Sequence, residues 1–390
     1  MQSIASLVRH LDRLQGSRLW MGLVVDDFPE LPGVSVETFF PSGPFGTTRG
    51  LTERNAFYRR ESLYEFATRL GEESGAIDVV LGQAAPRKAG CYSLGVSIDF
   101  LHPAALRAEH VILEVNAKTP WSGSQSCITD APNIVAVDGA GPLEVKPARH
   151  RGDVAMASYL LNWIPDGATI EFGIGNWFPP LIARLAEVRK GLRLHTGQIG
   201  DWMWKLMRTG ALCDTAPVVA TDAAGSAAFY DFLGSNTVVQ LLPATLTHSP
   251  ETLRQLPSFR AINSVFEIDL LGRANCEATR SGLRSGLGGL PDFARAAVAN
   301  PDGLSIIVMN STAKGSPRIV AELASEKPSL ESGDIEILVT ERGSADLRSL
   351  SPLSRAEAII SLAAEYDQPA LREAMQDKFS SPVPPSAGNR

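Results

Sequence analysis

Short apolar runs alternate with segments in which apolar residues recur at helical spacing through most of the chain. The runs predict strands at residues 76–81, 110–115, 168–172, 237–242, 304–309 and 335–339. The helical spacing predicts helices at residues 153–164, 179–190, 293–299 and 354–365. Such alternation is typical of parallel sheets flanked by helices. The fold class that we predict is therefore α/β, with mostly parallel sheets.

Glycine and proline accumulate between residues 138 and 153, which predicts a linker there. A chain of 390 residues is long enough for two domains. We therefore predict one α/β domain at residues 1–145 and a second at residues 153–375. Residues 376–390 are rich in proline and serine and have little to bury, so we expect a disordered tail. Residues 1–10 have the pattern of an amphipathic helix, not of a secretory signal.

Composition narrows the class of protein. A formal net charge of −7, with basic residues scattered along the chain, argues against nucleic-acid binding. No apolar run has the length of a membrane span. The four cysteines are isolated and form no C-x-x-C pair, which predicts a reduced, cytoplasmic protein and gives no metal motif. We therefore expect a cytoplasmic protein whose partners are small molecules.

One acid inside an apolar run carries most of the chemistry. Alternation places Glu267 and Asp269 on one face of a predicted strand, and taken alone this favours an edge strand with two solvated acids. A glycine loop at residues 286–289 then leads into a helix that starts near Pro291. Backbone N–H groups at such a turn can bind an oxyanion or a phosphate. This order favours a reactive acid beside an anion site. For Cys276, close by, packing is favoured over a nucleophilic role.

Several motifs, in the same order, resemble those of the acetyl-CoA hydrolase/transferase family, the family I CoA-transferases of the acetate, butyrate and 4-hydroxybutyrate type. The resemblance runs from about residue 30 to about residue 360. The family patterns INSALEVDLTGQVNAES, SGVGGQVDF, PSTA…SRIV and VTEYGVADLRG are matched by residues 262–277, 285–293, 310–320 and 339–349. Residues 90–97, 114–116, 172–175 and 230–233 also fit. The resemblance implies two tandem NagB-like domains, a homodimer, an acyl-CoA and a carboxylate as substrates, and no permanently bound cofactor.

The resemblance also implies roles for individual residues. The family's nucleophilic glutamate falls on Glu267, which implies double displacement through an acyl-glutamyl anhydride and a glutamyl-CoA thioester. Each step passes through a tetrahedral oxyanion, which fixed donors must stabilise. The glycine loop supplies the first candidate donors and Gly343 the second. The implied catalytic residues are Glu267, Gly288, Gly289 and Gly343, and the implied substrate and CoA contacts are Gly286, Leu287, Gly173, Gly175, Asn116, Leu290 and Arg342. A purely structural turn at residues 173–175, and a turn-forming role for Asn116, stay open.

The sequence departs from the family pattern where a substrate would be gripped. Leu290 replaces the usual glutamine, Arg342 replaces tyrosine or histidine, and Trp121 stands where arginine is common. Residues 195–202 lack the glutamate of the family pattern, and residues 176–180 are bulkier than their family counterparts. The strand that normally opens the first domain of the family is also missing. Trp121, Trp177 and Trp202 either reshape the acyl or acceptor pocket or are packing substitutions.

Four functions remain at this point. A CoA-transferase is favoured because Glu267 and the glycine loop are retained. An acyl-CoA hydrolase passes the acyl group from Glu267 to water, and a specialised biosynthetic acyltransferase passes it to another acceptor. A non-catalytic acyl-CoA-binding protein is the least favoured, because a site without activity has no reason to keep a partly buried acid. The sequence names neither the acyl group nor the acceptor.

Overall fold

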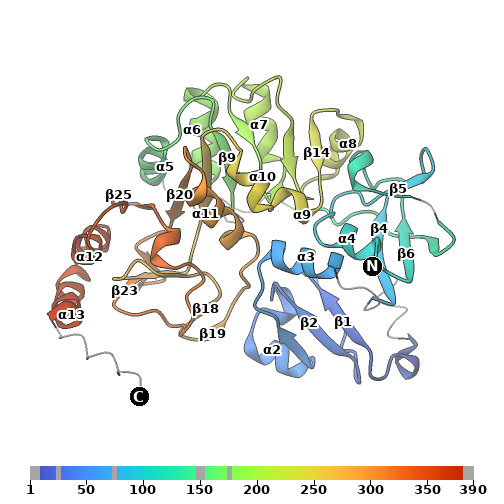
Figure 1. The fold of residues 1–390 in the computed structure, drawn as a ribbon, viewed down its shortest axis with the longest axis horizontal. Helices are drawn as coiled ribbons and strands as arrows, with labels where there is room; N and C mark the ends of the chain where they lie inside the picture. Colours follow the sequence, from blue (N-terminus) through green and yellow to red (C-terminus); the bar gives the residue numbers. More distant parts are fainter. Residues whose placement is uncertain are drawn as a thin grey trace, which may run out of the picture.

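The computed structural model describes residues 9–22, 28–72, 77–129, 131–145, 154–173 and 178–380. The first part of the chain forms two separate three-stranded parallel sheets, in the orders β1-β2-β3 and β4-β6-β8. Figure 1 shows the first sheet, in blue, below α3 and the second, in cyan, at the side of the molecule. The elements are β1 Arg18–Met21, β2 Ser35–Thr38, α2 Thr48–Glu53, β3 Ala56–Tyr58, α3 Leu63–Glu72, β4 Val79–Ala84, β5 Cys91–Ser93, α4 Leu101–Ala105, β6 His110–Val115, β7 Cys127–Thr129 and β8 Ile134–Asp138.

The second part is built on a six-stranded sheet in the order β10-β9-β15-β20-β24-β25. Its strands run parallel except for β25, which pairs antiparallel with β24. The strands from β9 to β24 are buried along their whole length, as parallel strands covered by helices are. Helix α11 packs on β15 and β20, and α5 packs on β24 and β25. The elements up to the fourth strand are α5 Val154–Leu161, β9 Thr169–Phe172, α6 Pro179–Val188, β10 Arg193–Leu194, β11 Gln198–Ile199, α7 Trp202–Arg208, β12 Val218–Ala220, β13 Asp222–Ala223, α8 Ala227–Ser235, β14 Val239–Leu241, α9 Ala244–Thr247, α10 Pro250–Arg254, β15 Phe259–Asn263, α11 Leu290–Ala299 and β20 Leu304–Val308.

A small sheet, in the order β17-β16-β23, follows β15 and carries the acid of interest. Figure 1 shows this region between the six-stranded sheet and the two C-terminal helices. Ile268 and Leu270 lie in a separate core that also includes Ile359 of α12 and Leu371 of α13. The helices therefore fix the strand that bears the acid. The elements here are β16 Glu267–Asp269, β17 Ala274–Asn275, β18 Ala278–Thr279, β19 Gly282–Leu283, β21 Thr312–Ala313, β22 Ser316–Pro317, β23 Ile319–Val320, β24 Ile337–Thr340, β25 Gly343–Asp346, α12 Pro352–Ser361 and α13 Gln368–Ser380.

The α/β class and the mostly parallel sheets are confirmed. The predicted strand at residues 110–115 is β6, and the predicted helix at 293–299 lies within α11. The start of the tail was placed wrongly, because residues 376–380 continue α13. Leu371, Met375 and Phe379 recur every four residues on this helix and pack into the core of α12 and β16, which orders it. Residues 381–390 and most of the predicted N-terminal helix lie outside the described residues, and the domain boundary stays a prediction.

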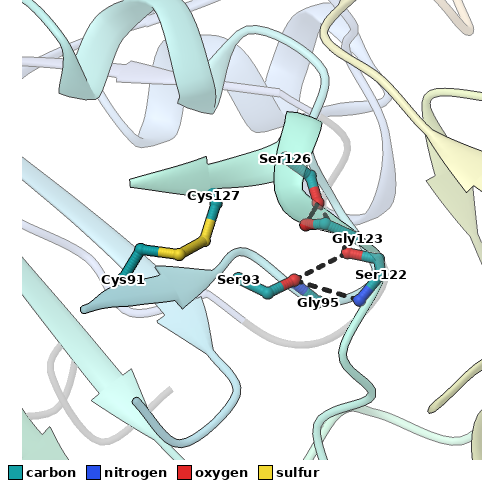
Figure 2. The surroundings of a disulfide bond; sticks show 7 residues. All are labelled: Cys91, Ser93, Gly95, Ser122, Gly123, Ser126 and Cys127. Carbon is teal, nitrogen blue, oxygen red and sulfur yellow. Dashed lines mark hydrogen bonds between the residues drawn. A yellow bond between two sulfur atoms is a disulfide. The ribbon is translucent and has the colours of Figure 1, made fainter. Parts of the chain in front are cut away.

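The prediction that all four cysteines are isolated is wrong. Cys91 on β5 and Cys127 on β7 form a disulfide, with Cα atoms 5.9 Å apart (Figure 2). The two strands pair antiparallel, which brings together cysteines that are 36 residues apart in the sequence. A C-x-x-C pattern identifies only cysteines that are close in the sequence. Cys91 and Cys127 are too far apart to be recognised in this way. Disulfides persist mainly in oxidising environments, so the cysteines no longer support a reduced compartment. In the described part of the chain, none of the helices is both long and apolar enough to span a bilayer.

Candidate active site

Glu267 is the first residue of β16 and is buried, with 8% of its surface exposed. Two groups donate hydrogen bonds to its Oε1: the amide Nδ2 of Asn275, at 3.0 Å, and the backbone N–H of Ala324. Within the described residues, neither these groups nor any other protein donor contacts Oε2. The alternative of a solvated strand acid is therefore excluded. One carboxylate oxygen is held by two donors, and the other has no protein donor among the described residues.

A partly buried arginine, Arg318, lies beside this carboxylate. The guanidinium of Arg318 donates to the backbone carbonyls of Phe266, at 2.7 Å, and Val265, so it fixes the residues that precede Glu267. Burial lowers its pKa, while the negative charges of Glu267 and Glu341 act in the opposite direction. Glu341 itself accepts hydrogen bonds from the N–H of Ser311, at 2.8 Å, and from its hydroxyl. A single cation thus faces two acids.

The sequence analysis did not select Glu341, although it stands next to Arg342 in the matched motif at residues 339–349. The side chain of Arg342 lies between two acids and pairs with Glu365 at 3.2 Å and with Glu341 at 3.8 Å. Gly343 follows as the first residue of the edge strand β25, with φ at 154°, a conformation that favours glycine. The sequence signal for Glu341 is its place in the matched motif at residues 339–349. Only the fold shows that Glu341 and Glu267 both lie near the guanidinium of Arg318.

The glycine loop is anchored by the first part of the chain. The N–H of Leu287 donates to the hydroxyl of Tyr58 at 3.1 Å, and the carbonyl of Gly288 accepts from the N–H of Leu63 at 2.9 Å. Gly288 has φ at 55°, in the left-handed region, and a side chain at Gly286 would overlap the carbonyl of Phe39. Helix α11 starts one residue before Pro291, as the sequence indicates. The N–H groups of Gly288 and Gly289 meet no acceptor among the residues that the structure describes.

The segment from Asn275 to Glu277 joins the acid to this loop. The side chain of Asn275 holds Glu267, and the carbonyl of Glu277 accepts from the N–H groups of Arg284, at 2.7 Å, and Ser285, at 3.0 Å. Glu267 and the glycine loop are therefore connected through the segment from Asn275 to Ser285. The thiol of Cys276 contacts the carbonyl of Gly286 at 3.7 Å, and burial raises its pKa to about 12. A thiol that stays protonated is a poor nucleophile, which supports packing as its role.

The carboxylate of Glu277 connects the two parts of the molecule. It accepts hydrogen bonds from Tyr58 at 2.6 Å, Arg60 at 2.7 Å and Ser329 at 2.7 Å. Burial and the adjacent Glu277 raise the pKa of Tyr58, so its hydroxyl stays protonated and can donate. The sequence analysis missed Tyr58 and Arg60, because they lie more than 200 residues before their partner and belong to no matched motif.

The other predicted contacts are more dispersed. Leu290 begins α11, where its side chain is buried in the same core as Ile268 of β16. Gly173 follows β9, where a side chain would overlap the amide of Asn263. The side chain of Asn116 accepts from the N–H of Lys118, as in a turn, and donates to the carbonyl of Gly139, 23 residues further along the chain. Gly175 and Trp177 lie outside the described residues. Within the described ranges, no group of His, Cys, Asp or Glu side chains could hold a metal ion.

This fold, with a buried acid beside a glycine loop, defines an enzyme of the CoA-transferase class. Residues 225–376 match the acetyl-CoA hydrolase/transferase C-terminal domain. The 4-hydroxybutyrate coenzyme A transferase of Clostridium kluyveri is 30% identical over 348 residues, which cover 86% of this chain and 80% of that protein. The chain belongs to the acetyl-CoA hydrolase/transferase family.

Two further relatives show the range of activities in the family. The solved structure of 4-hydroxybutyrate CoA-transferase from Porphyromonas gingivalis is 26% identical, covers 96% of each chain and has a TM-score of 0.76. The acetyl-CoA hydrolase of Saccharomyces cerevisiae is 26% identical over 374 residues, which cover 81% of this chain and 68% of that protein. The relatives include CoA-transferases and a hydrolase, both of which act on CoA thioesters. Membership of the family therefore does not decide between transfer and hydrolysis, and the geometry of the site has to.

Proposed function

We propose that this enzyme moves CoA between an acyl-CoA and a carboxylic acid, with Glu267 as the nucleophile. The observation that supports this most directly is the asymmetric environment of the carboxylate. Two N–H donors hold Oε1, and Oε2 faces none among the described residues. A buried carboxylate held through one oxygen is positioned for attack by the other, because its solvation shell does not have to be removed first.

The proposed reaction exchanges acyl bonds in balanced steps. Oε2 attacks the thioester carbonyl, the C–S bond breaks, and CoA leaves as a thiolate, which produces an acyl-glutamyl anhydride. The thiolate then attacks the glutamyl carbonyl of Glu267, and the original acyl group leaves as a carboxylate, so that a glutamyl-CoA thioester remains. An incoming carboxylate reverses both steps and departs as the new acyl-CoA. One thioester replaces another, so the exchange requires no ATP.

Oxyanion stabilisation is assigned to the glycine loop in this proposal. The N–H groups of Gly288 and Gly289, without acceptors among the described residues, are the first candidates, and that of Gly343 is the second. The binding of CoA and substrate is assigned to Gly286, Leu287, Leu290, Arg342, Gly173, Gly175 and Asn116. A homodimer remains part of the proposal. A cytoplasmic location does too, but the disulfide Cys91–Cys127 means that the cysteines do not support it.

Hydrolysis is the second candidate, and the name of the yeast relative gives it weight. It requires water to reach the acyl-glutamyl bond, whereas Glu267 is only 8% exposed. That burial favours transfer. A specialised acyltransferase would use the same attack by Glu267 and differ only in the acceptor of the acyl group. A non-catalytic acyl-CoA-binding protein would carry out no chemical step.

The test is to incubate the protein with acetyl-CoA or butyryl-CoA without an acceptor and to measure its intact mass. A CoA adduct on Glu267 is expected, and Glu267→Gln should abolish it and lower turnover at least about 10³-fold. Affinity for acyl-CoA should stay nearly intact. The matched control is Glu326→Gln, an exposed acid two residues after Ala324.

Each other outcome contradicts the proposal in its own way. Steady release of CoA without an adduct would favour the hydrolase. Tight binding of acyl-CoA without either event would indicate a binding protein. Turnover that survives in Glu267→Gln would show that the nucleophile has been assigned wrongly.

A further inference from the structure

A buried histidine lies against Gly289 of the glycine loop. His248 follows α9 and is 1% exposed. Its ring packs on Phe293 of α11, with centroids 4.4 Å apart. A Cβ built on Gly289 would lie 2.5 Å from its Nε2, and one on Gly197 would lie 3.6 Å from the same atom. The Nε2 edge of the ring therefore occupies space that two glycines leave open.

The two nitrogens of this ring have different surroundings. Nδ1 lies 2.8 Å from the hydroxyl of Thr247. Nε2 contacts no protein hydrogen-bond partner among the described residues. A second histidine fixes Thr247, because Nε2 of His195 lies 2.8 Å from its backbone carbonyl, which can only accept. Thr247 is thus held through its backbone and in turn orients the ring of His248.

The protonation state follows from these contacts. Burial and the adjacent His195 lower the pKa of His248 to about 3, so its imidazole is neutral at physiological pH and carries one hydrogen. The hydroxyl of Thr247 has two acceptors in reach: Nδ1 at 2.8 Å and the carbonyl of Pro243 at 3.4 Å. The 2.8 Å contact can form with either partner as the donor, since a ring with hydrogen on Nδ1 would let the hydroxyl donate to Pro243. The tautomer proposed for this site is the other one, which places a donor at Nε2, an atom without a protein partner among the described residues. When the hydroxyl donates to Nδ1, the hydrogen of the ring must be on Nε2.

We propose that Nε2–H of His248 donates a hydrogen bond to the carbonyl oxygen of the acyl-CoA thioester bound at the glycine loop. This inference rests on the proposed function, since it assigns a third donor to the oxyanion formed when Glu267 attacks. A donor that is fixed before the reaction stabilises developing negative charge without reorganising. A neutral imidazole adds a further advantage, because it does not hold the carboxylate product by an ion pair.

Single-turnover kinetics test the assignment. The rate of adduct formation on Glu267 from acetyl-CoA is measured by rapid quench and intact mass. His248→Leu removes the donor and should slow this rate by about 10²- to 10³-fold, with a much smaller change in KM. His248→Gln restores an N–H donor and should recover part of the rate. His110→Gln, at an exposed position, is the matched control and should leave the rate unchanged.

Two results separate this proposal from the proposed function. If the wild type forms no adduct, the proposed function fails whatever His248 does. If the wild type forms the adduct and a folded His248→Leu forms it within about twofold as fast, the donor role alone is overturned, since 1.4 kcal/mol already corresponds to tenfold.

A measurement on the wild type avoids dependence on the folding of variants. Protein labelled with ¹⁵N-histidine should show a neutral His248 ring with hydrogen on Nε2 from about pH 5 to about pH 9. Addition of an acetyl-CoA analogue with CH₂ in place of the thioester sulfur should shift this signal. A ring with hydrogen on Nδ1, or a signal that the analogue leaves unchanged, would overturn the proposal.

Discussion

At the scale of single residues, another buried glutamate, Glu171, differs from Glu267 in its chemistry. Glu171 on β9 is 1% exposed and accepts one hydrogen bond, at 2.6 Å, from the amide of Asn263. Burial raises its pKa to about 8. The carboxyl group therefore stays largely protonated at neutral pH, unlike an acid suited to nucleophilic attack. Gly173 leaves the space that the amide of Asn263 occupies, which favours a structural role for this turn.

Replacement of Glu171 by glutamine should flatten the dependence of stability on pH. The folded-state pKa of about 8 lies above the ordinary glutamate value of 4.5, so the stabilisation is fully present below about pH 4.5 and is lost as the pH rises towards 8. In the wild type, the free energy of unfolding should fall by up to about 1.4 kcal/mol per pH unit in this window. Glu171→Gln should lose that part of the slope. The thermal midpoints of both proteins are measured from about pH 4.5 to about pH 8. The same dependence on pH in the two proteins would contradict this prediction.

At the scale of elements, the contact between the loop after β3 and Glu277 holds the glycine loop in position. Arg60 donates to the carboxylate of Glu277 and also to the carbonyl of Pro328, at 2.7 Å. Tyr58 bonds both Glu277 and the N–H of Leu287. Loss of this contact should therefore affect the stability of the whole enzyme and the position of the oxyanion donors together.

We expect Arg60→Met to destabilise the protein by about 2–3 kcal/mol. The reason is that it leaves a buried carboxylate with fewer partners, a loss only partly offset by Tyr58 and Ser329. The matched control is Arg49→Met, which breaks an exposed pair with Glu53 and should leave the stability nearly unchanged. Denaturant unfolding measures both. Equal effects would show that the Arg60 pair contributes no more than a surface pair.

Local elements were predictable because local signals define them. The glycines and Pro291 identified the start of α11, and apolar runs identified β6, β9 and β20. The burial of Glu267 was not predictable, because alternation along β16 cannot show that Asn275 and the backbone of Ala324 contact its side chain. Tyr58, Arg60 and His248 come from elements distant in sequence, and only the parallel sheets bring them to the loop.

At the scale of the whole molecule, the alternation of strands and helices was enough to predict the α/β class. The disulfide between β5 and β7 could not be predicted in this way. The pair Cys91–Cys127 closes a segment 36 residues long. Beside it, the hydroxyls of Ser93 and Ser122 bond at 2.8 Å, and that of Ser126 bonds Ser122 at 2.9 Å (Figure 2). These bonds join the same two chain segments without the disulfide.

Cys91→Ser should therefore lower the thermal midpoint without preventing folding. A closed loop of this length stabilises by about 3–4 kcal/mol in the chain-entropy model. The serine hydrogen bonds should keep β5 and β7 paired, so adduct formation on Glu267 should persist below the new midpoint. Cys213→Ser is the control, since Cys213 is a free thiol and should give a midpoint like that of the wild type. If reductant leaves the wild-type midpoint unchanged, the disulfide does not stabilise the fold, and a count of free thiols in the purified protein then shows whether it forms at all.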